Sequence, residues 1–197
     1  MKIAVDIDNV LAKSAETIVG LVNKYFDKQF TIDKWTNWHL KECARITEEQ
    51  QEIIFTMFHM DRVVVNIPKV EYANGIIARL INEGNQISLI TARPKEAYSA
   101  TERWLSLNNF RHNILIFEKA KAKKMDGADF LIEDSYENAI DVVEKTSTKV
   151  LLLNKPWNLG RPKHKDIIRF SNWQEINDYL FLREAIEICQ KRKQAAV

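Results

Sequence analysis

Cysteine is scarce in this sequence, and it has neither a long apolar run nor a bias toward charge of one sign. The 197 residues include two cysteines, Cys43 and Cys189, which lie far apart and match no metal-binding spacing. No stretch approaches the roughly 20 apolar residues that a membrane helix needs. The 29 basic and 27 acidic side chains nearly cancel. These absences speak against a disulfide scaffold, a membrane protein and a partner that is a nucleic-acid polymer.

The composition is that of an ordinary globular protein. Apolar residues make up 46% and charged residues 28% of the chain, which is enough to build a sizeable core. The length allows one ample domain, or one domain with a large insertion. The chain enters an apolar stretch at once, without the pattern of a cleavable leader. We therefore expect a cytoplasmic protein.

Five short runs are apolar on both faces, a pattern that favours buried parallel strands over half-exposed ones. Amphipathic helical patterns lie between most of them, and Pro68 and Pro94 precede two of these. Alternation of this kind predicts an α/β fold of Rossmann-like type, with a parallel sheet of five or more strands and helices on both faces. The runs are residues 2–7, 86–91, 113–117, 129–133 and 149–153; the helical patterns are 69–83, 95–108, 136–145 and 173–193.

About sixty residues after the first run contain no good strand pattern. They predict three helices, 14–26, 32–43 and 47–60, the last opened by a capping box of Thr47 and Gln50. Such a segment is too long for a loop. We expect residues 14–67 to form a small helical cap over the carboxyl edge of the sheet, and residues 1–13 and 68–197 to form the α/β core.

Polar residues stand where the predicted strands end, which is where open α/β sheets bind their ligands. Asp6 and Asp8 follow the first strand, and strand alternation would place both carboxylates on one face, where they need a cation or a shared proton. Thr91 ends the second strand, and Asp134, preceded by another acid, ends the fourth. Taken singly, each has a plainer interpretation: an acidic pair or a threonine is often a turn or a helix cap, and Lys123 lies in a lysine-rich stretch typical of a solvated helix face.

In their order, these residues resemble the motifs of the haloacid dehalogenase (HAD) superfamily of phosphohydrolases. That pattern is Asp-x-Asp after the first strand, then Thr or Ser, then Lys, then an acidic pair, and the resemblance covers residues 1–153. The helical insertion also matches a cap that this superfamily places after its first motif. DIDNVLA (6–12), GADFLIEDS (127–135) and NKPWN (154–158) further resemble the 5′(3′)-deoxyribonucleotidase branch.

The resemblance implies a role for each matching residue. Asp6 would be the nucleophile and form an aspartyl-phosphate, while Asp8 would act as general acid and base, protonated with help from the charge of Asp6. Mg²⁺ would bind to Asp6, to the backbone carbonyl of Asp8 and to Asp134. Thr91 and Lys123 would bind phosphate oxygens, and the neighbouring Lys124 is the alternative lysine.

The substrate class is less closely defined than the chemistry. Arg93 is either a substrate-binding residue or a surface residue at a helix start. Aromatic residues of the cap, such as Trp35 and Trp38, either fill a small core or stack on a nucleobase. We expect an enzyme whose substrate is a nucleoside monophosphate. The alternatives are a phosphatase of the same superfamily that acts on another small phosphate ester, and a non-catalytic binding protein with the same fold. A homodimer could cover a site that a small cap leaves partly open.

Overall fold

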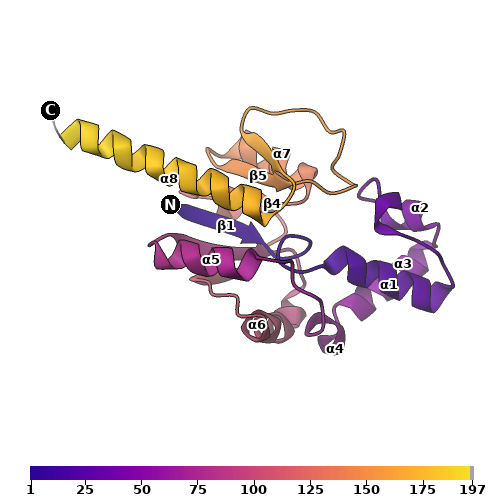
Figure 1. The fold of residues 1–197 in the computed structure, drawn as a ribbon. Coiled ribbons are helices and arrows are strands. Elements are labelled where there is room, and N and C mark those ends of the chain that lie inside the picture. The colour runs from indigo at the N-terminus through magenta and orange to yellow at the C-terminus, as the bar shows by residue number, and fades with distance from the viewer. Residues whose placement is uncertain (196–197) are drawn as a thin grey trace.

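The computed structural model describes residues 1–195 and contains one six-stranded parallel sheet with the strand order β3-β2-β1-β4-β5-β6 (Figure 1). The five predicted strands are confirmed. The sixth, β6, follows a polar loop and is only four residues long, so its apolar pattern is weak. The strands are β1 (Lys2–Asp6), β2 (Gln86–Thr91), β3 (Ile114–Phe117), β4 (Phe130–Glu133), β5 (Lys149–Leu153) and β6 (Ile167–Phe170).

β1 occupies the middle of the sheet, between β2 and β4. Val5 is in register with Leu89 of β2 and with Ile132 of β4. Because all three strands are parallel, their carboxyl ends meet at the same edge. The strands β2 and β3 follow β1 on one side of the sheet, and β4, β5 and β6 lie on its other side. Where the strand order reverses in this way, a crevice forms at the carboxyl ends of the strands.

Helices cover both faces of the sheet, as predicted, because neighbouring residues of each strand point to opposite sides. Ile3 and Val5 of β1 join the larger core, which includes residues of α5, α6 and α8, whereas Ala4 joins a smaller core beneath α7. The predicted helix at 69–83 begins later than Pro68 suggests. The helices are α5 (Ala73–Asn82), α6 (Tyr98–Leu107), α7 (Tyr136–Lys145) and α8 (Trp173–Ala195), with 3₁₀ turns η2 (Lys95–Ala97) and η3 (Lys121–Lys124).

The segment after β1 is helical, and Figure 1 shows its helices beyond the carboxyl end of β1. Helix α1 packs on α3, and the capping box of Thr47 and Gln50 is present. The single helix expected over 32–43 is wrong: Trp35 leaves the helical path and packs against Phe30 and Trp157. The elements are α1 (Ser14–Phe26), η1 (Ile32–Lys34), α2 (Leu40–Ala44), α3 (Glu48–Phe58) and α4 (Asp61–Val64). The division into a cap of residues 14–67 and a core stays a prediction.

Helix α8 closes the larger core. Its first turns bury Trp173, Ile176 and Leu180, and the Trp173 indole N–H donates a 2.9 Å hydrogen bond to the carbonyl of Val10. This bond ties α8 to the loop that follows β1. Among residues 1–195, no helix combines the length and the apolar character that crossing a bilayer requires.

Candidate active site

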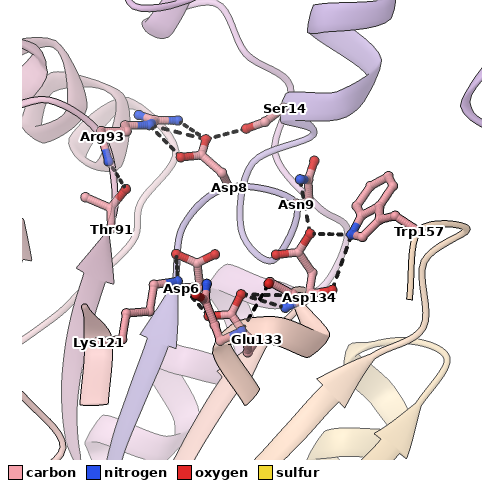
Figure 2. A network of polar contacts seen from close by, with 12 residues as sticks. Asp6, Asp8, Asn9, Ser14, Thr91, Arg93, Lys121, Glu133, Asp134 and Trp157 are labelled. Atoms are coloured by element: carbon pink, nitrogen blue, oxygen red, sulfur yellow. Dashed lines mark hydrogen bonds and ion pairs between the residues drawn. The ribbon is translucent and has the colours of Figure 1, made fainter. Parts of the chain in front are cut away.

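The two aspartates at the end of β1 point in different directions (Figure 2). The strand ends at Asp6, and the backbone then turns back on itself through Asn9, whose φ is 61°. The N–H groups of Leu11 and Ala12 donate to the carbonyl of Ile7 and close this turn. Strand alternation therefore stops before Asp8. The expectation that both carboxylates share one face of a strand is wrong for this reason, and each has its own cationic partner.

The partner of Asp6 is Lys121. Its Nζ lies 2.7 Å from Oδ1 of Asp6 and 2.6 Å from Oε2 of Glu133, and its side chain is only 2% exposed. Lys123, the lysine expected from the sequence, is exposed, and so is Lys124. The structure therefore places Lys121 at the site and leaves the other two in solvent.

The local helix explains which lysine turns inward. Residues 121–124 form a single 3₁₀ turn, in which Lys121 is buried whereas Lys123 and Lys124 are exposed. Counting residues back from Glu133 cannot reveal which side of a four-residue turn faces the sheet.

Three buried carboxyl groups gather beside this lysine, belonging to Asp6, Glu133 and Asp134. One carboxylate oxygen from each lies within 4.8 Å of the other two. Oε1 of Glu133 accepts the backbone N–H groups of the two residues that follow it, at 3.1 and 3.0 Å. Oδ2 of Asp134 accepts from Trp157 Nε1 at 3.0 Å and from Asn9 Nδ2 at 3.2 Å. These bonds fix the orientation of both side chains.

The charges of this cluster do not balance, because three buried carboxyls face one buried ammonium. Burial raises the pKa of Asp6 to about 8, with Glu133 and Asp8 adding to the rise and Lys121 opposing it. Burial, followed by the charge of Glu133, also raises the pKa of Asp134 well above its usual value. Burial alone would lower the pKa of Lys121, but Asp6 and Glu133 outweigh it and raise that pKa. A divalent cation would restore neutrality, and carboxylate oxygens are the donors that Mg²⁺ prefers.

Asp8 is held by Arg93, whose side chain is 1% exposed. Nη2 of Arg93 lies 2.7 Å from Oδ1 of Asp8, and Nε lies 3.0 Å from Oδ2, so the pair is bidentate. The hydroxyl of Ser14 donates to the same carboxylate. Burial favours a raised pKa for Asp8, but Arg93 and Ser14 outweigh it and hold that pKa below its usual value. The sequence predicts the opposite shift for the pKa of Asp8, because it does not reveal that Arg93 pairs with this carboxylate.

Thr91 ends β2 and is fully buried. Its hydroxyl oxygen accepts the backbone N–H of Arg93 at 3.2 Å, so the threonine shapes the turn that carries the arginine. The Arg93 side chain also donates to Thr101 of α6 at 3.1 Å and lies over the ring of Phe58, 5.9 Å from its centre. Arg93 is therefore buried and connects Asp8 to Thr101 of α6 and to Phe58 of α3. The alternative interpretation of Arg93 as a surface residue at a helix start is wrong.

A cavity of about 420 Å³ opens onto this cluster. One side of the cavity consists of the acidic and basic side chains of the cluster. The other side, the aromatic wall, is formed mainly by aromatic side chains from the helical segment after β1. Trp38 is half exposed on that wall, whereas Trp35 is buried. Trp35 therefore belongs to the core, whereas the stacking of a base on Trp38 stays a prediction. Among the lining residues are Asp6, Asp8, Arg93, Lys119, Lys121, Glu133, Asp134, Trp35, Trp38, Phe55, Phe58, His59 and Trp157.

A central β1 followed by this helical excursion, with an acidic cluster at the strand ends, is the arrangement of the HAD-type fold. A HAD-superfamily hydrolase from Ehrlichia chaffeensis matches 92% of this chain over 96% of its own, with 12% identity and a TM-score of 0.55. A HAD-type protein of Bacillus subtilis, bound to magnesium, matches 91% of this chain over 97% of its own, with 11% identity and a TM-score of 0.58. These likenesses concern the fold.

The family follows from the sequence itself. Residues 1–186 match the family described as 5′ nucleotidase, deoxy (pyrimidine), cytosolic type C protein. A protein of Clostridium acetobutylicum that is named a nucleotidase is 25% identical over 184 residues, which cover 89% of this chain and 91% of that protein. The chain belongs to the cytosolic type C 5′-nucleotidase family and is a phosphoric monoester hydrolase.

Some contacts of the site carry no recognisable signal in the sequence. Lys121 looks like its exposed neighbours, and nothing in DIDNVLA or NKPWN shows that Asn9 and Trp157 donate hydrogen bonds to Asp134. Trp157 belongs to the loop after β5, more than twenty residues from its partner. Its place in NKPWN, directly after a strand end, is the clue that the sequence offers, since parallel strands all end at the same edge.

Proposed function

We propose that this chain is a Mg²⁺-dependent 5′-nucleotidase that hydrolyses (deoxy)nucleoside monophosphates. The observation that best supports this proposal is that one cavity opens onto both Asp6 and the aromatic side chains beyond it. A nucleoside monophosphate has a charged end and a flat apolar end, and the two walls of the cavity match these ends.

The cation would bind among the buried carboxylates. Asp6 and Asp134 would supply side-chain oxygens, and the backbone carbonyl of Asp8 is a further proposed ligand. Glu133 already accepts from Lys121 and from two backbone N–H groups, so it would support the site. Bound there, Mg²⁺ would reduce the repulsion between a carboxylate nucleophile and a phosphate dianion.

Asp6 would attack the phosphorus atom, so that a bond forms from its carboxylate oxygen and the bond to the nucleoside oxygen breaks. Asp8 would protonate the departing oxygen and then accept a proton from the water that cleaves the aspartyl-phosphate. Arg93 keeps Asp8 ionised in the free protein. The charge of an arriving phosphate dianion would favour proton uptake by Asp8.

Lys121 takes the place of Lys123 in this proposal. Its ammonium lies at hydrogen-bond distance from Asp6 and would neutralise a phosphate oxygen as charge develops there. Thr91 would donate its hydroxyl hydrogen to a second phosphate oxygen. Arg93 would hold Asp8 in place and not bind the substrate directly.

The test is a panel of phosphate esters with the purified protein and Mg²⁺. We expect phosphate release from nucleoside monophosphates to exceed that from sugar phosphates of equal charge, because only the former offer a base to Trp38 and Phe55. Equal rates for ribose 5-phosphate and the nucleotides would instead favour another small phosphate ester as substrate. Absence of turnover with every ester would favour the non-catalytic alternative.

A further inference from the structure

The second half of α8 carries an apolar stripe that nothing in the described chain covers. The last residue of α8 that packs in the core is Leu180. Beyond it, Phe181 is 63% and Leu182 is 59% exposed, and the helix extends past the rest of the fold (Figure 1). The stripe consists of Phe181, Leu182, Ala185, Ile186, Ile188 and Cys189, all exposed.

These residues lie on one side of the helix, because the spacings between them are close to three and four residues. Single exposed apolar side chains are common on protein surfaces, but six in one stripe are not. The helix itself gives a second indication. Glu184 accepts a hydrogen bond from Asn85 at 2.8 Å, and about three helical turns follow it. A helical extension of that length with little tertiary packing is marginal in water. Both features indicate that another surface packs on this part of α8.

The charges at the two ends of the stripe show which surface fits. Asp178, which is exposed, lies at its beginning, and Arg192 and Lys193, also exposed, lie at its end. If a second copy of α8 is laid antiparallel with its centre between Ala185 and Ile186, Asp178 of each copy faces Lys193 of the other. In the same alignment, Leu182 faces Cys189. A parallel arrangement would instead bring like charges together.

We propose that this stripe pairs with the same stripe of a second copy of the chain, so that the protein forms an antiparallel, two-fold symmetric homodimer through α8. Such an interface is self-complementary, as two-fold symmetry requires. It is short, so we expect a dissociation constant in the micromolar range. The stripe lies away from the carboxyl edge of the sheet, and the pairing does not depend on the proposed nucleotidase activity.

The first test measures the mass of the full-length protein in solution, by sedimentation velocity over a wide concentration range and under reducing conditions. We expect a monomer–dimer equilibrium. Leu182→Glu should weaken it by at least about tenfold, because it buries a charge within the paired stripes, opposite Cys189. Leu107→Glu on α6 is the matched control, since Leu107 is 62% exposed outside the stripe. A wild-type protein that stays monomeric throughout would overturn the proposal, as would a dimer that Leu182→Glu leaves intact.

The second test concerns the orientation of the two helices. Asp178→Lys and Lys193→Asp should each weaken the dimer, and the double variant should restore it, because the reversed charges again face each other. In a Cys43→Ser background, Leu182→Cys should form a disulfide with the native Cys189 of the second copy. Circular dichroism of each variant verifies that the fold is kept. Rapid formation of a Cys189–Cys189 disulfide without the added cysteine would indicate a parallel pair and contradict the proposal.

Discussion

Lys121 and Asp6 form a buried ion pair with 2.7 Å between Nζ and Oδ1, at the point where the central strand of the sheet ends. The lysine also contacts Glu133, so a single ammonium holds two carboxylates from neighbouring strands. Such a pair is costly to break, because the partners left behind are buried charges. In the proposed mechanism, it also keeps the nucleophile oriented toward the cavity.

The first prediction concerns the choice among the three lysines. Lys121→Ala should lower the turnover of a nucleoside monophosphate by about a hundredfold or more, because the charge that develops on the phosphate is no longer compensated. Lys123→Ala and Lys124→Ala should have almost no effect, since both side chains are exposed. Lys121→Arg keeps the charge and serves as a second variant should the alanine variant unfold. A larger defect in Lys123→Ala than in either Lys121 variant would remove Lys121 from the proposed role.

The second prediction links pH, Mg²⁺ and stability. In the folded protein without metal, the pKa of Asp6 is about 8, against 3.8 for an ordinary aspartate. The folded state therefore binds more protons than the unfolded state between these values, and the free energy of unfolding should fall as pH rises from about 4 to 8. Added Mg²⁺ binds the deprotonated carboxylates, so it should stabilise the protein more at pH 8.5 than at pH 5.5.

Thermal unfolding in a chelator and in Mg²⁺, followed at several pH values, measures this coupling. Asp6→Asn is the control, because an amide cannot titrate, and it should flatten the pH dependence that Asp6 contributes. Stability in the chelator that rises between pH 5 and pH 8 would contradict the charge imbalance inferred for the cluster. So would a stabilisation by Mg²⁺ that does not change with pH.

The third prediction separates orientation from substrate binding at Arg93. Arg93→Gln should lower kcat by about tenfold or more and leave KM nearly unchanged, because the arginine orients Asp8. Arg93→Lys should recover little, since an ammonium cannot form the bidentate pair. Arg111→Gln, at an exposed arginine, controls for the loss of one positive charge. A raised KM with an unchanged kcat would show that Arg93 binds the phosphate.

The fourth prediction concerns the aromatic wall. Trp38→Ala should raise the KM for a nucleoside monophosphate by about fivefold or more, because stacking of a base on an aromatic ring contributes about 1–3 kcal/mol. The KM for ribose 5-phosphate should stay the same. Tyr25→Ala, in a similarly exposed aromatic residue of α1, should alter neither. An equal rise for both substrates would place Trp38 against the sugar or the phosphate instead of the base.

The sequence predicts the sheet well because its inner strands are buried on both faces, and this burial makes their sequence runs mostly apolar. Asp6, Thr91 and Asp134 could be placed for the same reason, since each follows a recognisable run. The lysine could not, because one 3₁₀ turn decides which of three similar side chains is buried. The broken helix at 32–43 depends on the packing of Trp35 against Trp157, more than one hundred residues away.

Arg93 illustrates a different limit. Its partners Asp8, Thr101 and Phe58 come from three separate elements. Contacts between segments that lie so far apart in the chain leave no local pattern in the sequence. For the same reason, the sequence misjudges the pKa of Asp8, which depends on a guanidinium eighty-five residues away.

The central claim is that Asp6 becomes phosphorylated during turnover. Its most direct test is rapid mixing of the protein with a nucleoside monophosphate and Mg²⁺, followed by acid quenching, borohydride reduction and peptide mass spectrometry. We predict a reduced acyl-phosphate site on the peptide that contains Asp6, and none in Asp6→Asn, which should fold but not turn over. Steady turnover by a folded Asp6→Asn variant, or trapping of the phosphate on another residue, would contradict the account.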